Sequence, residues 1–208
     1  MQLSSNYHLI KTKDGSYTLF NKTLEESFNS YFGAKSESLY YFFEANGLLK
    51  EKRRPVNILE IGLGQGTNLL QALKLKGEIH YHSIEIDPFL IDYTIDRLNL
   101  NFTQENNHYF YTSTNFNIHL YLADASQHIF KIISRFDFFF HDPFSPGKNP
   151  TLWSYPFFRQ LKNLAKEGAI LTSYSSASLA RKNMNLAGWQ VKKIKGFASK
   201  REALLATT

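Results

Sequence analysis

Cysteine is absent from the 208 residues of this chain. Disulfides, thiolate zinc sites, iron–sulfur clusters and a cysteine nucleophile are therefore all excluded. No apolar run approaches the roughly 18 residues that a transmembrane helix needs, and the first ten residues are too polar for a signal peptide. These absences predict a soluble protein of the cytoplasm that has no membrane partner.

Apolar and aromatic residues are abundant. Hydrophobic residues make up 43% of the chain and aromatic residues 15%, including 18 Phe and 12 Tyr. This is enough apolar material to bury a core, so wholesale disorder is excluded. The length fits one large domain. The formal net charge of +6 permits a polyanionic partner without establishing one.

Segments typical of strands and of helices alternate along most of the chain. Residues 1–54 predict an N-terminal hairpin and helix extension packed on a core, and residues 55–208 predict the main domain. Residues 99–117 are polar and carry no pattern that predicts an element. Strands are expected over 16–20, 56–61, 79–86, 118–122, 136–140, 169–174, 189–194 and 203–207, and helices over 36–46, 68–75, 87–98, 125–133, 156–165 (closed by Gly168) and 177–187.

This alternation predicts the fold class. Strands separated by helices pair in parallel through right-handed crossovers, with helices on both faces of the sheet. We therefore expect an α/β, doubly wound, Rossmann-like sheet that is mostly parallel. The last two strands have no helix between them, so they should form an antiparallel hairpin at one edge. Ligands of such folds bind beyond the carboxyl ends of the strands.

A glycine-rich loop, E-I-G-L-G-Q-G-T-N over residues 60–68, leaves the first strand of the main domain. A dinucleotide fingerprint would need glycine at Thr67, and the Gly-Lys-Ser/Thr of a phosphate-binding loop is absent. The spacing of Gly62, Gly64 and Gly66 after an acidic residue resembles motif I of the S-adenosylmethionine-dependent methyltransferases. The three glycines also fit a plain tight turn between a strand and a helix.

Two further acidic residues follow later strands. Glu85 lies 19 positions after Gly66, near the end of the second strand, where a ribose-binding carboxylate belongs. Its alternative is a solvated charge at a strand end. Asp124 follows the third strand, where this superfamily places an aspartate that contacts adenine. Asp124 also fits the N-cap of the next helix, and the two roles are compatible.

The apolar segment 136–140 predicts a buried strand whose exit brings Asp142 to the ligand edge of the sheet. A carboxylate there can hydrogen-bond an acceptor amine, orient it and accept its proton during methyl transfer. Phe144 is placed to stack on a planar base, and Lys148 to contact a phosphate. The plainer alternatives are a turn cap for Asp142, a core position for Phe144 and a loop anchor for Lys148. His141 neighbours Asp142, but strand alternation favours its facing away.

This region carries a more specific resemblance. Its D-x-F-x-P-x-K-N-P-x-x-W pattern resembles the methyltransferase domain of the MnmC-type tRNA-modifying enzymes. The similarity covers most of the chain from about Asp14, outside residues 99–117. The segments that carry it are 31–33, 37–38, 46–48, 136–153, 174–181, 187–189, 195–197 and 200–202.

The resemblance implies S-adenosylmethionine as the cofactor. It further implies N-methylation of the aminomethyl group of 5-aminomethyl-2-thiouridine at the tRNA wobble position, which gives 5-methylaminomethyl-2-thiouridine. Asp142 then acts at the acceptor amine. The flavin-dependent oxidase domain of the bifunctional members is missing, which implies a stand-alone form. The residues assigned to the cofactor are Glu60, Gly62, Gly64, Gly66, Asn68 and Glu85.

The positive charge is concentrated near the end of the chain. Residues 159–208 contain 10 Lys and Arg but only two acidic residues. We expect this tail to contact phosphates of a tRNA anticodon stem-loop. The residues expected to do so are Lys192, Lys193, Lys195, Lys200 and Arg201.

Two other functions remain open from the sequence. One is a methyltransferase that acts on a small amine, for which the positive charge would be incidental. The other is a non-catalytic RNA-binding module on the same fold. The seven histidines show no metal-ligand spacing, so no metal is expected.

Overall fold

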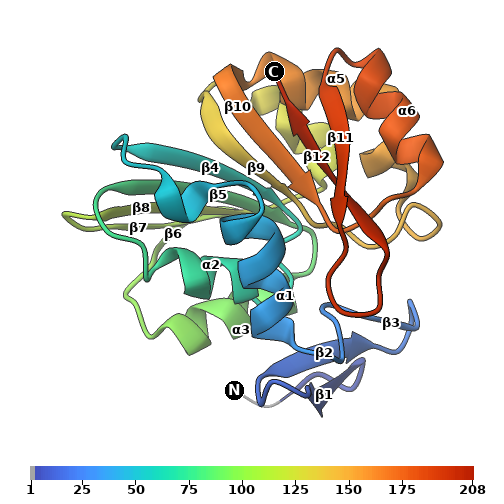
Figure 1. The fold of residues 1–208 in the computed structure, drawn as a ribbon. Helices are drawn as coiled ribbons and strands as arrows, with labels where there is room; N and C mark the ends of the chain where they lie inside the picture. The colour runs from blue at the N-terminus through green and yellow to red at the C-terminus, as the bar shows by residue number, and fades with distance from the viewer. Residues whose placement is uncertain (1–2) are drawn as a thin grey trace.

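The computed structural model describes residues 3–208, in which nine strands form one mixed sheet and three short strands form a second, N-terminal sheet (Figure 1). No helix within this range is both long and apolar enough to cross a membrane. The strands of the large sheet lie in the order β11 (Gln190–Lys195), β12 (Glu202–Thr207), β10 (Ala165–Ser173), β9 (Phe136–His141), β4 (Val56–Ile61), β5 (Ile79–Glu85), β8 (Phe116–Leu122), β7 (His108–Thr112) and β6 (Thr103–Glu105).

The centre of the sheet is parallel and both of its edges are antiparallel. Strands β10, β9, β4, β5 and β8 pair in parallel, which confirms the doubly wound prediction. Strands β11 and β12 form the expected antiparallel hairpin at one edge. The unassigned stretch 99–117 contains β6 and β7, which add two antiparallel strands at the other edge. These edge strands bury little apolar surface, so their sequence lacks a clear hydrophobic alternation.

Helices cover both faces of the large sheet (Figure 1). Neighbouring residues of a strand point to opposite faces, so Ile58 and Phe138 enter one core while Leu59 and Phe139 enter the other. The first core is covered by α1 (Ala34–Leu39), α2 (Thr67–Ala72) and α3 (Pro88–Leu98), and the second by α4 (Ala125–His128), α5 (Tyr155–Asn163) and α6 (Ser178–Leu186).

Three helix boundaries differ from expectation. Helix α5 ends at Asn163, and the prediction that Gly168 closes it is wrong, because Gly168 lies inside β10 with a φ of 72°. The pairing of β10 with β9 starts at Ala165 and changes register before Ile170. Gly168 therefore lies in a β-bulge or similar irregularity of the strand. The helix expected over 125–133 is α4 followed by a 3₁₀ turn over Ile129–Lys131. Helix α1 continues as a π-helical turn over Tyr40–Glu44.

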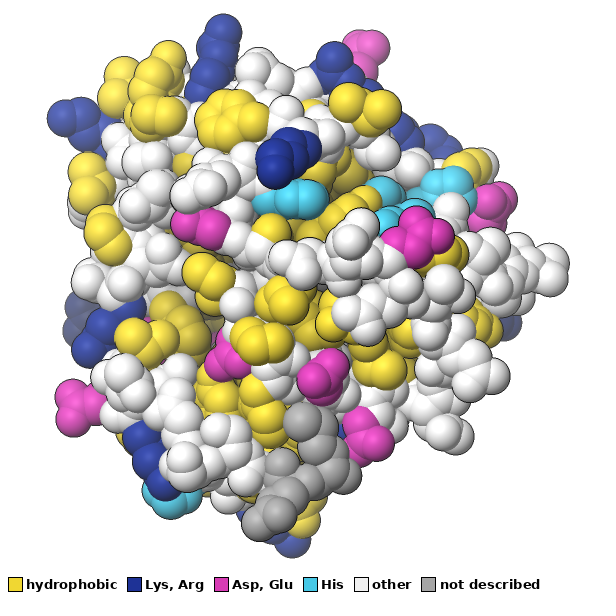
Figure 2. Space-filling view, turned by 180° about the vertical axis from the view of Figure 1, so that it is seen from behind, with side chains coloured by type: hydrophobic (Ala, Val, Ile, Leu, Met, Phe, Trp, Pro, Cys, Tyr) yellow, Lys and Arg dark blue, Asp and Glu magenta, His cyan; other side chains and the backbone are white. Residues whose placement is uncertain are grey.

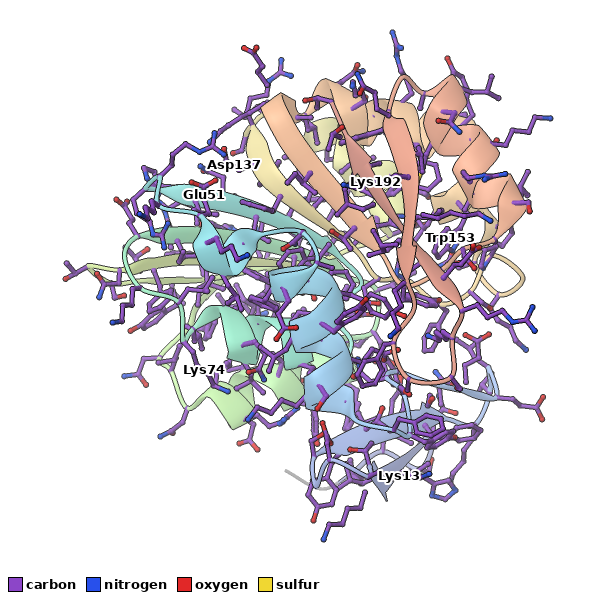
Figure 3. The ribbon with its side chains drawn as sticks, in the orientation of Figure 1. Lys13, Glu51, Lys74, Asp137, Trp153 and Lys192 are labelled. Atoms are coloured by element: carbon purple, nitrogen blue, oxygen red, sulfur yellow. The ribbon has the colours of Figure 1, made fainter. Side chains whose placement is uncertain are left out.

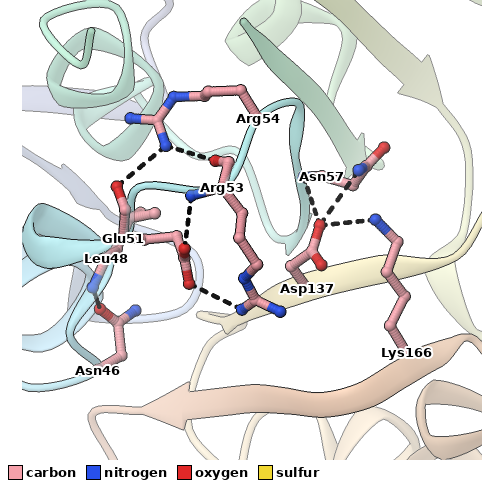
Figure 4. A network of polar contacts seen from close by, with 8 residues as sticks. All are labelled: Asn46, Leu48, Glu51, Arg53, Arg54, Asn57, Asp137 and Lys166. Atoms are coloured by element: carbon pink, nitrogen blue, oxygen red, sulfur yellow. Dashed lines mark hydrogen bonds and ion pairs between the residues drawn. The ribbon is translucent and has the colours of Figure 1, made fainter. Parts of the chain in front are cut away.

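The charged connector that precedes β4 is held in place by polar contacts (Figure 4). Glu51 accepts a hydrogen bond from the Arg53 guanidinium at 2.7 Å, and its carbonyl oxygen accepts one from Arg54 at 3.0 Å. Nearby, Lys166 donates to Asp137 at 2.7 Å. Asp137 lies at the start of β9, so this network fixes the amino ends of the strands, the pole opposite the glycine loop.

Histidines from neighbouring strands stack on one another on the face of β5, β8 and β7 (Figure 2 shows them at the surface). The rings of His82 and His119 lie 4.5 Å apart, and those of His108 and Tyr121 lie 4.7 Å apart. Burial lowers the pKa of His82 to about 3 and that of His119 to about 4. At neutral pH these rings are uncharged, so they pack as aromatic side chains.

The buried His82 predicts a contribution to stability that acid removes. Its folded-state pKa lies below its ordinary value, so the unfolded chain binds the proton more tightly and the free energy of unfolding falls as the pH drops below about 6.5. For this group alone the loss at pH 5 is about 2 kcal/mol. His82→Phe keeps a stacked ring, and urea denaturation should show a smaller loss of stability between pH 7.5 and pH 5 than in the wild type.

The matched control is His8→Phe, which replaces an exposed ring of β1 (Tyr7–Lys11). It should leave the wild-type pH dependence unchanged. Identical pH slopes for His82→Phe and the wild type would contradict the prediction.

Candidate active site

A cavity of about 750 Å³ lies beyond the carboxyl ends of the parallel strands, as the fold predicts. Its floor comes from the glycine loop after β4 and from the ends of β5, β8, β9 and β10. The N-terminal sheet, made of β1, β2 (Tyr17–Asn21) and β3 (Glu26–Ser27), covers it from the other side. Residues of the predicted extension therefore line the same cavity as residues of the predicted main domain.

The two glycines of the loop that line the cavity, Gly62 and Gly64, lie too close to their neighbours to carry a side chain. A Cβ on Gly62 would lie 2.9 Å from the carbonyl oxygen of Asp142, and one on Gly64 would lie 2.7 Å from the ring of Phe28. Both glycines also have positive φ angles, 88° and 54°. Their bare backbone faces the cavity, where a bound molecule can approach it closely.

Glu85 is fixed at the end of β5 by backbone amides. Its carboxylate accepts hydrogen bonds from the N–H groups of Gly64, Ile86 and Asp87 at 2.9, 2.8 and 3.0 Å. Burial raises its pKa, and these bonds oppose the shift by favouring the charged form. The carboxylate ties the glycine loop to β5 and lines the cavity, where the predicted ribose ligand belongs.

Asn68 connects three elements through one amide group. Its Nδ2 donates to Glu60 at 2.9 Å and to Asp142 at 3.1 Å, while its Oδ1 accepts from the Ser38 hydroxyl. Glu60 also accepts from Ser83 at 2.8 Å. Glu60 is fully buried and lies outside the cavity lining, and burial raises its pKa to about 8. Its observed contacts position Asn68 and Ser83, and its assignment to the cofactor stays a prediction.

Asp142 lies where the sequence predicted it, just after β9 at the ligand edge. Burial, followed by the nearby charges of Glu60 and Glu37, holds the pKa of this carboxyl well above its ordinary value. The hydrogen bond from Asn68 and the charge of Lys200 oppose the shift. A carboxylate in such surroundings is a stronger base than one in water.

Sequence reasoning did not select Glu37, Tyr174 or Glu26, which also line the cavity. Glu37 of α1 accepts from the backbone N–H of Ser30 at 2.7 Å and from the Lys200 ammonium at 3.1 Å. The same ammonium lies 4.5 Å from the ring centroid of Tyr174, whose hydroxyl donates to the carbonyl of Pro143 at 2.9 Å. The third, Glu26, contacts Ser145. Tyr174 follows β10, so the carboxyl-end rule could have found it, whereas Glu37 was noted only in a segment that carries the family resemblance and was given no role.

The N-terminal sheet docks on the glycine loop through one side chain. Gln65 accepts a hydrogen bond from the backbone N–H of Leu19 at 2.6 Å and donates to the carbonyl of Tyr17 at 2.8 Å. Gln65 lies between Gly64 and Gly66, so its two hydrogen bonds fix the position of the N-terminal sheet relative to the glycine loop.

The remaining predicted site residues divide between the cavity and its surroundings. Asp124 caps α4 by accepting from the N–H of Ser126 at 2.8 Å, which confirms the N-cap; it also lines the cavity, and its contact with adenine stays a prediction. Phe144 lines the cavity with its ring 4.9 Å from that of Phe28. Gly66 and Lys148 lie outside the lining, and Lys148 is exposed.

His141 faces away from the cavity, as strand alternation favours. Its ring is fully buried and meets the ring of Trp153 edge-on, with 4.5 Å between the ring centroids (Trp153 is labelled in Figure 3). Its Nε2 lies 2.9 Å from the carbonyl oxygen of Leu152. Burial lowers its pKa to about 4. The neutral ring anchors the loop that follows β9.

The five basic residues that were expected to contact tRNA phosphates do not share one surface. Successive side chains of a strand point to opposite faces, so Lys193 and Lys195 lie on one face of β11. Lys192 lies on the other face (Figure 3). Lys193 pairs with Glu202 at 2.7 Å. Lys200 belongs to the cavity, which leaves Lys192, Lys195 and Arg201 as the exposed members of these five for which the structure shows no ion pair.

The cavity residues fit S-adenosylmethionine. Its sulfonium is a cation, and carboxylates of Glu37, Glu85 and Asp142 line the space. Bare glycine backbone permits close approach of the amino-acid portion, and Glu85 with Asp124 provides acceptors for the hydroxyl and amino groups of an adenosine.

Comparison with known proteins gives the class. A family model described as S-adenosyl-L-methionine-dependent methyltransferase matches residues 91–208. The chain belongs to this family and is an enzyme that uses S-adenosylmethionine. It is 28% identical to the uncharacterized protein MJ0670 of Methanocaldococcus jannaschii, over 99% of this chain and 60% of that protein.

Two further relatives show the particular type. The chain is 28% identical to the tRNA 5-methylaminomethyl-2-thiouridine biosynthesis bifunctional protein MnmC of Ralstonia nicotianae, over 91% of this chain and 33% of that protein. The crystal structure of MnmC2 from Aquifex aeolicus superposes with a TM-score of 0.82 and 29% identity, over 98% of this chain and 70% of that one. The chain is thus an MnmC-like methyltransferase domain, and it spans 60% and 33% of the lengths of these two curated relatives.

Loss of the Glu85 carboxylate should weaken cofactor binding. Glu85→Ala leaves three backbone N–H groups without their acceptor, which loosens the glycine loop and removes the expected ribose ligand. We expect the dissociation constant for S-adenosylhomocysteine, measured by calorimetry, to rise at least about tenfold. Glu105→Ala on the exposed strand β6 is the control and should bind normally. An unchanged constant in folded Glu85→Ala would exclude this role.

Proposed function

We propose that this enzyme methylates the aminomethyl nitrogen of 5-aminomethyl-2-thiouridine at the wobble position of tRNA, giving 5-methylaminomethyl-2-thiouridine. The observation that carries the proposal is the position of Asp142, which Asn68 holds beside the glycine loop in a cavity open to solvent. The similarity to MnmC and MnmC2 supports the choice of tRNA as substrate.

The chemistry requires little from the protein beyond alignment and removal of a proton. S-adenosylmethionine supplies a methyl group on a sulfonium sulfur, and the electron pair of the broken carbon–sulfur bond stays with sulfur. An alkylamine is mostly protonated in water, so it has no lone pair for attack. Asp142 accepts its proton: one nitrogen–hydrogen bond breaks and one oxygen–hydrogen bond forms. The electron pair left on nitrogen then forms the new bond to the methyl carbon. The raised pKa of Asp142 favours this transfer.

The rim of the cavity suits a base from a single-stranded loop. Tyr31 and Phe32 line the cavity and are 47% and 42% exposed, and the Lys13 ammonium lies 4.5 Å from the ring centroid of Phe32. Together with Phe144 they present aromatic faces beside a cation, a combination that binds stacked bases and phosphates. Anticodon-loop bases can enter such a site without the breaking of a duplex.

The reaction can be tested directly with tRNA that carries the aminomethyl group. Nucleoside mass spectrometry should show a gain of one methyl group at the wobble uridine after incubation with enzyme and S-adenosylmethionine. Asp142→Asn should lower the rate by roughly 10²- to 10⁴-fold, because the proton acceptor is removed, while the affinity for S-adenosylhomocysteine stays within about threefold.

Asp92→Asn, an exposed change on α3, is the matched control and should keep full activity. Transfer to free polyamines but not to tRNA would replace the proposal by the small-amine alternative. Full activity of Asp142→Asn would remove Asp142 from the mechanism.

The exposed cations of the tail should supply part of the tRNA footprint. The triple change of Lys192, Lys195 and Arg201 to glutamate should weaken tRNA binding and flatten its dependence on salt. The logarithmic slope should fall by about one for each tRNA phosphate that the variant no longer neutralises. A filter-binding titration at several salt concentrations measures both quantities.

The matched control makes the same charge change at the opposite pole, at Lys50, Lys52 and Lys76, which are also exposed. It should reduce tRNA binding much less. Equal reductions in the two triple variants would show that net charge, rather than the tail, governs binding.

A further inference from the structure

Lys200 is the one cation among the cavity-lining residues within 3–208. Seven acidic residues line the same space, so its ammonium lies in strongly negative surroundings. The seven are Glu25, Glu26, Glu37, Glu85, Asp87, Asp124 and Asp142. A surface lysine that served only to contact tRNA phosphate would have no reason to enter this cavity.

The contacts of the Lys200 ammonium are those of a bound alkylammonium ion. Its Nζ lies 3.1 Å from Oε1 of Glu37 and 4.5 Å from the ring centroid of Tyr174. A carboxylate paired with an aromatic face is a standard recognition site for such a cation. Asp142 is close enough for the charge of Lys200 to lower the pKa of its carboxyl group.

Glu37 and Tyr174 are fixed by hydrogen bonds to the backbone, whereas Lys200 reaches them from the surface. Glu37 has a side chain only 7% exposed, and its second oxygen accepts from Ser30. Tyr174 is held by its hydrogen bond to Pro143, the residue after Asp142. The Lys200 side chain is 42% exposed and projects from the connection between β11 and β12. Displacing it leaves the site itself intact.

We propose that Glu37 and the ring of Tyr174 form the subsite for the ammonium group of the methyl acceptor, and that Lys200 fills this subsite until the acceptor displaces it. The choice of an aminomethyl group as acceptor rests on the proposed function. The incoming ammonium takes the place of the Lys200 ammonium and lies beside Asp142, which accepts its proton. The freed Lys200 then turns to solvent and makes no contact that binding of the acceptor requires.

The arrangement selects amines against alcohols. A hydroxyl acceptor carries no charge, so it cannot replace the Lys200 ammonium in its ion pair with Glu37. An alkylammonium ion makes the same contacts as the lysine and exchanges with it at little cost.

The subsite can be tested with n-butylammonium, with 1-butanol as the neutral probe, by calorimetry on the enzyme saturated with S-adenosylhomocysteine. Lys200→Met removes the competing ammonium and keeps the length of the side chain. It should bind n-butylammonium at least tenfold more tightly than the wild type does. The double variant Glu37→Gln/Lys200→Met should not show that gain, and 1-butanol should bind none of the proteins measurably.

Lys52→Met, an exposed change outside the cavity, is the control and should bind n-butylammonium as the wild type does. Thermal midpoints and affinity for S-adenosylhomocysteine report folding, and Lys200→Gln replaces Lys200→Met if either is disturbed. Equal n-butylammonium affinity in the wild type and the Lys200 variant, or retained affinity in the double variant, would overturn the subsite.

Kinetics with aminomethylated tRNA separate the subsite from the proposed function. Lys200→Met should lower KM for this tRNA severalfold without lowering kcat. A raised KM would show that Lys200 binds tRNA in place and would overturn the proposal. If n-butylammonium binds as expected but the wild type methylates no tRNA, the tRNA function fails and the ammonium subsite stands, with a small amine as acceptor.

Discussion

The double hydrogen bond donated by the Asn68 amide is the contact on which the site depends. It holds Glu60 of β4 and Asp142 after β9 on one side chain at the start of α2, while Ser38 fixes the amide from α1. Glu60 and Asn68 are fully shielded or nearly so, and breaking a buried hydrogen bond costs about 1–3 kcal/mol. The position of the proposed base is therefore set by the same bonds that join the glycine loop to the sheet.

The charges at the cavity determine which molecules it can bind. Burial, followed by repulsion from neighbouring carboxylates, raises the pKa values of Glu60, Glu85 and Asp142. A cation that enters the cavity relieves that repulsion. Lys200 already does so from within the chain, and the cofactor sulfonium and an acceptor ammonium carry the same charge. The acidic lining of the cavity therefore suits the cationic cofactor and the cationic acceptor that we propose.

Much of this could be predicted from local sequence. The alternation of strands and helices predicted the parallel centre of the sheet, and the glycine spacing with Glu85 and Asp142 predicted its ligand edge. These predictions hold because residues that follow parallel strands meet at the same edge of the sheet, where ligands of this fold bind. Residues 99–117 gave no signal because β6 and β7 bury little. Gly168 misled because a positive φ suits a helix end and a strand irregularity equally.

The sequence by itself determined the fold class, the glycine loop and the position of the candidate base, since each depends on residues near one another in the chain or at strand ends. Tertiary structure decided that Glu37 and Lys200, 163 positions apart, meet in the cavity and that the N-terminal sheet covers it. It also divided the basic tail between a cavity lysine and surface cations. The reason is physical: a charge has no local periodicity, so its partner is known only once the chain has brought distant segments together.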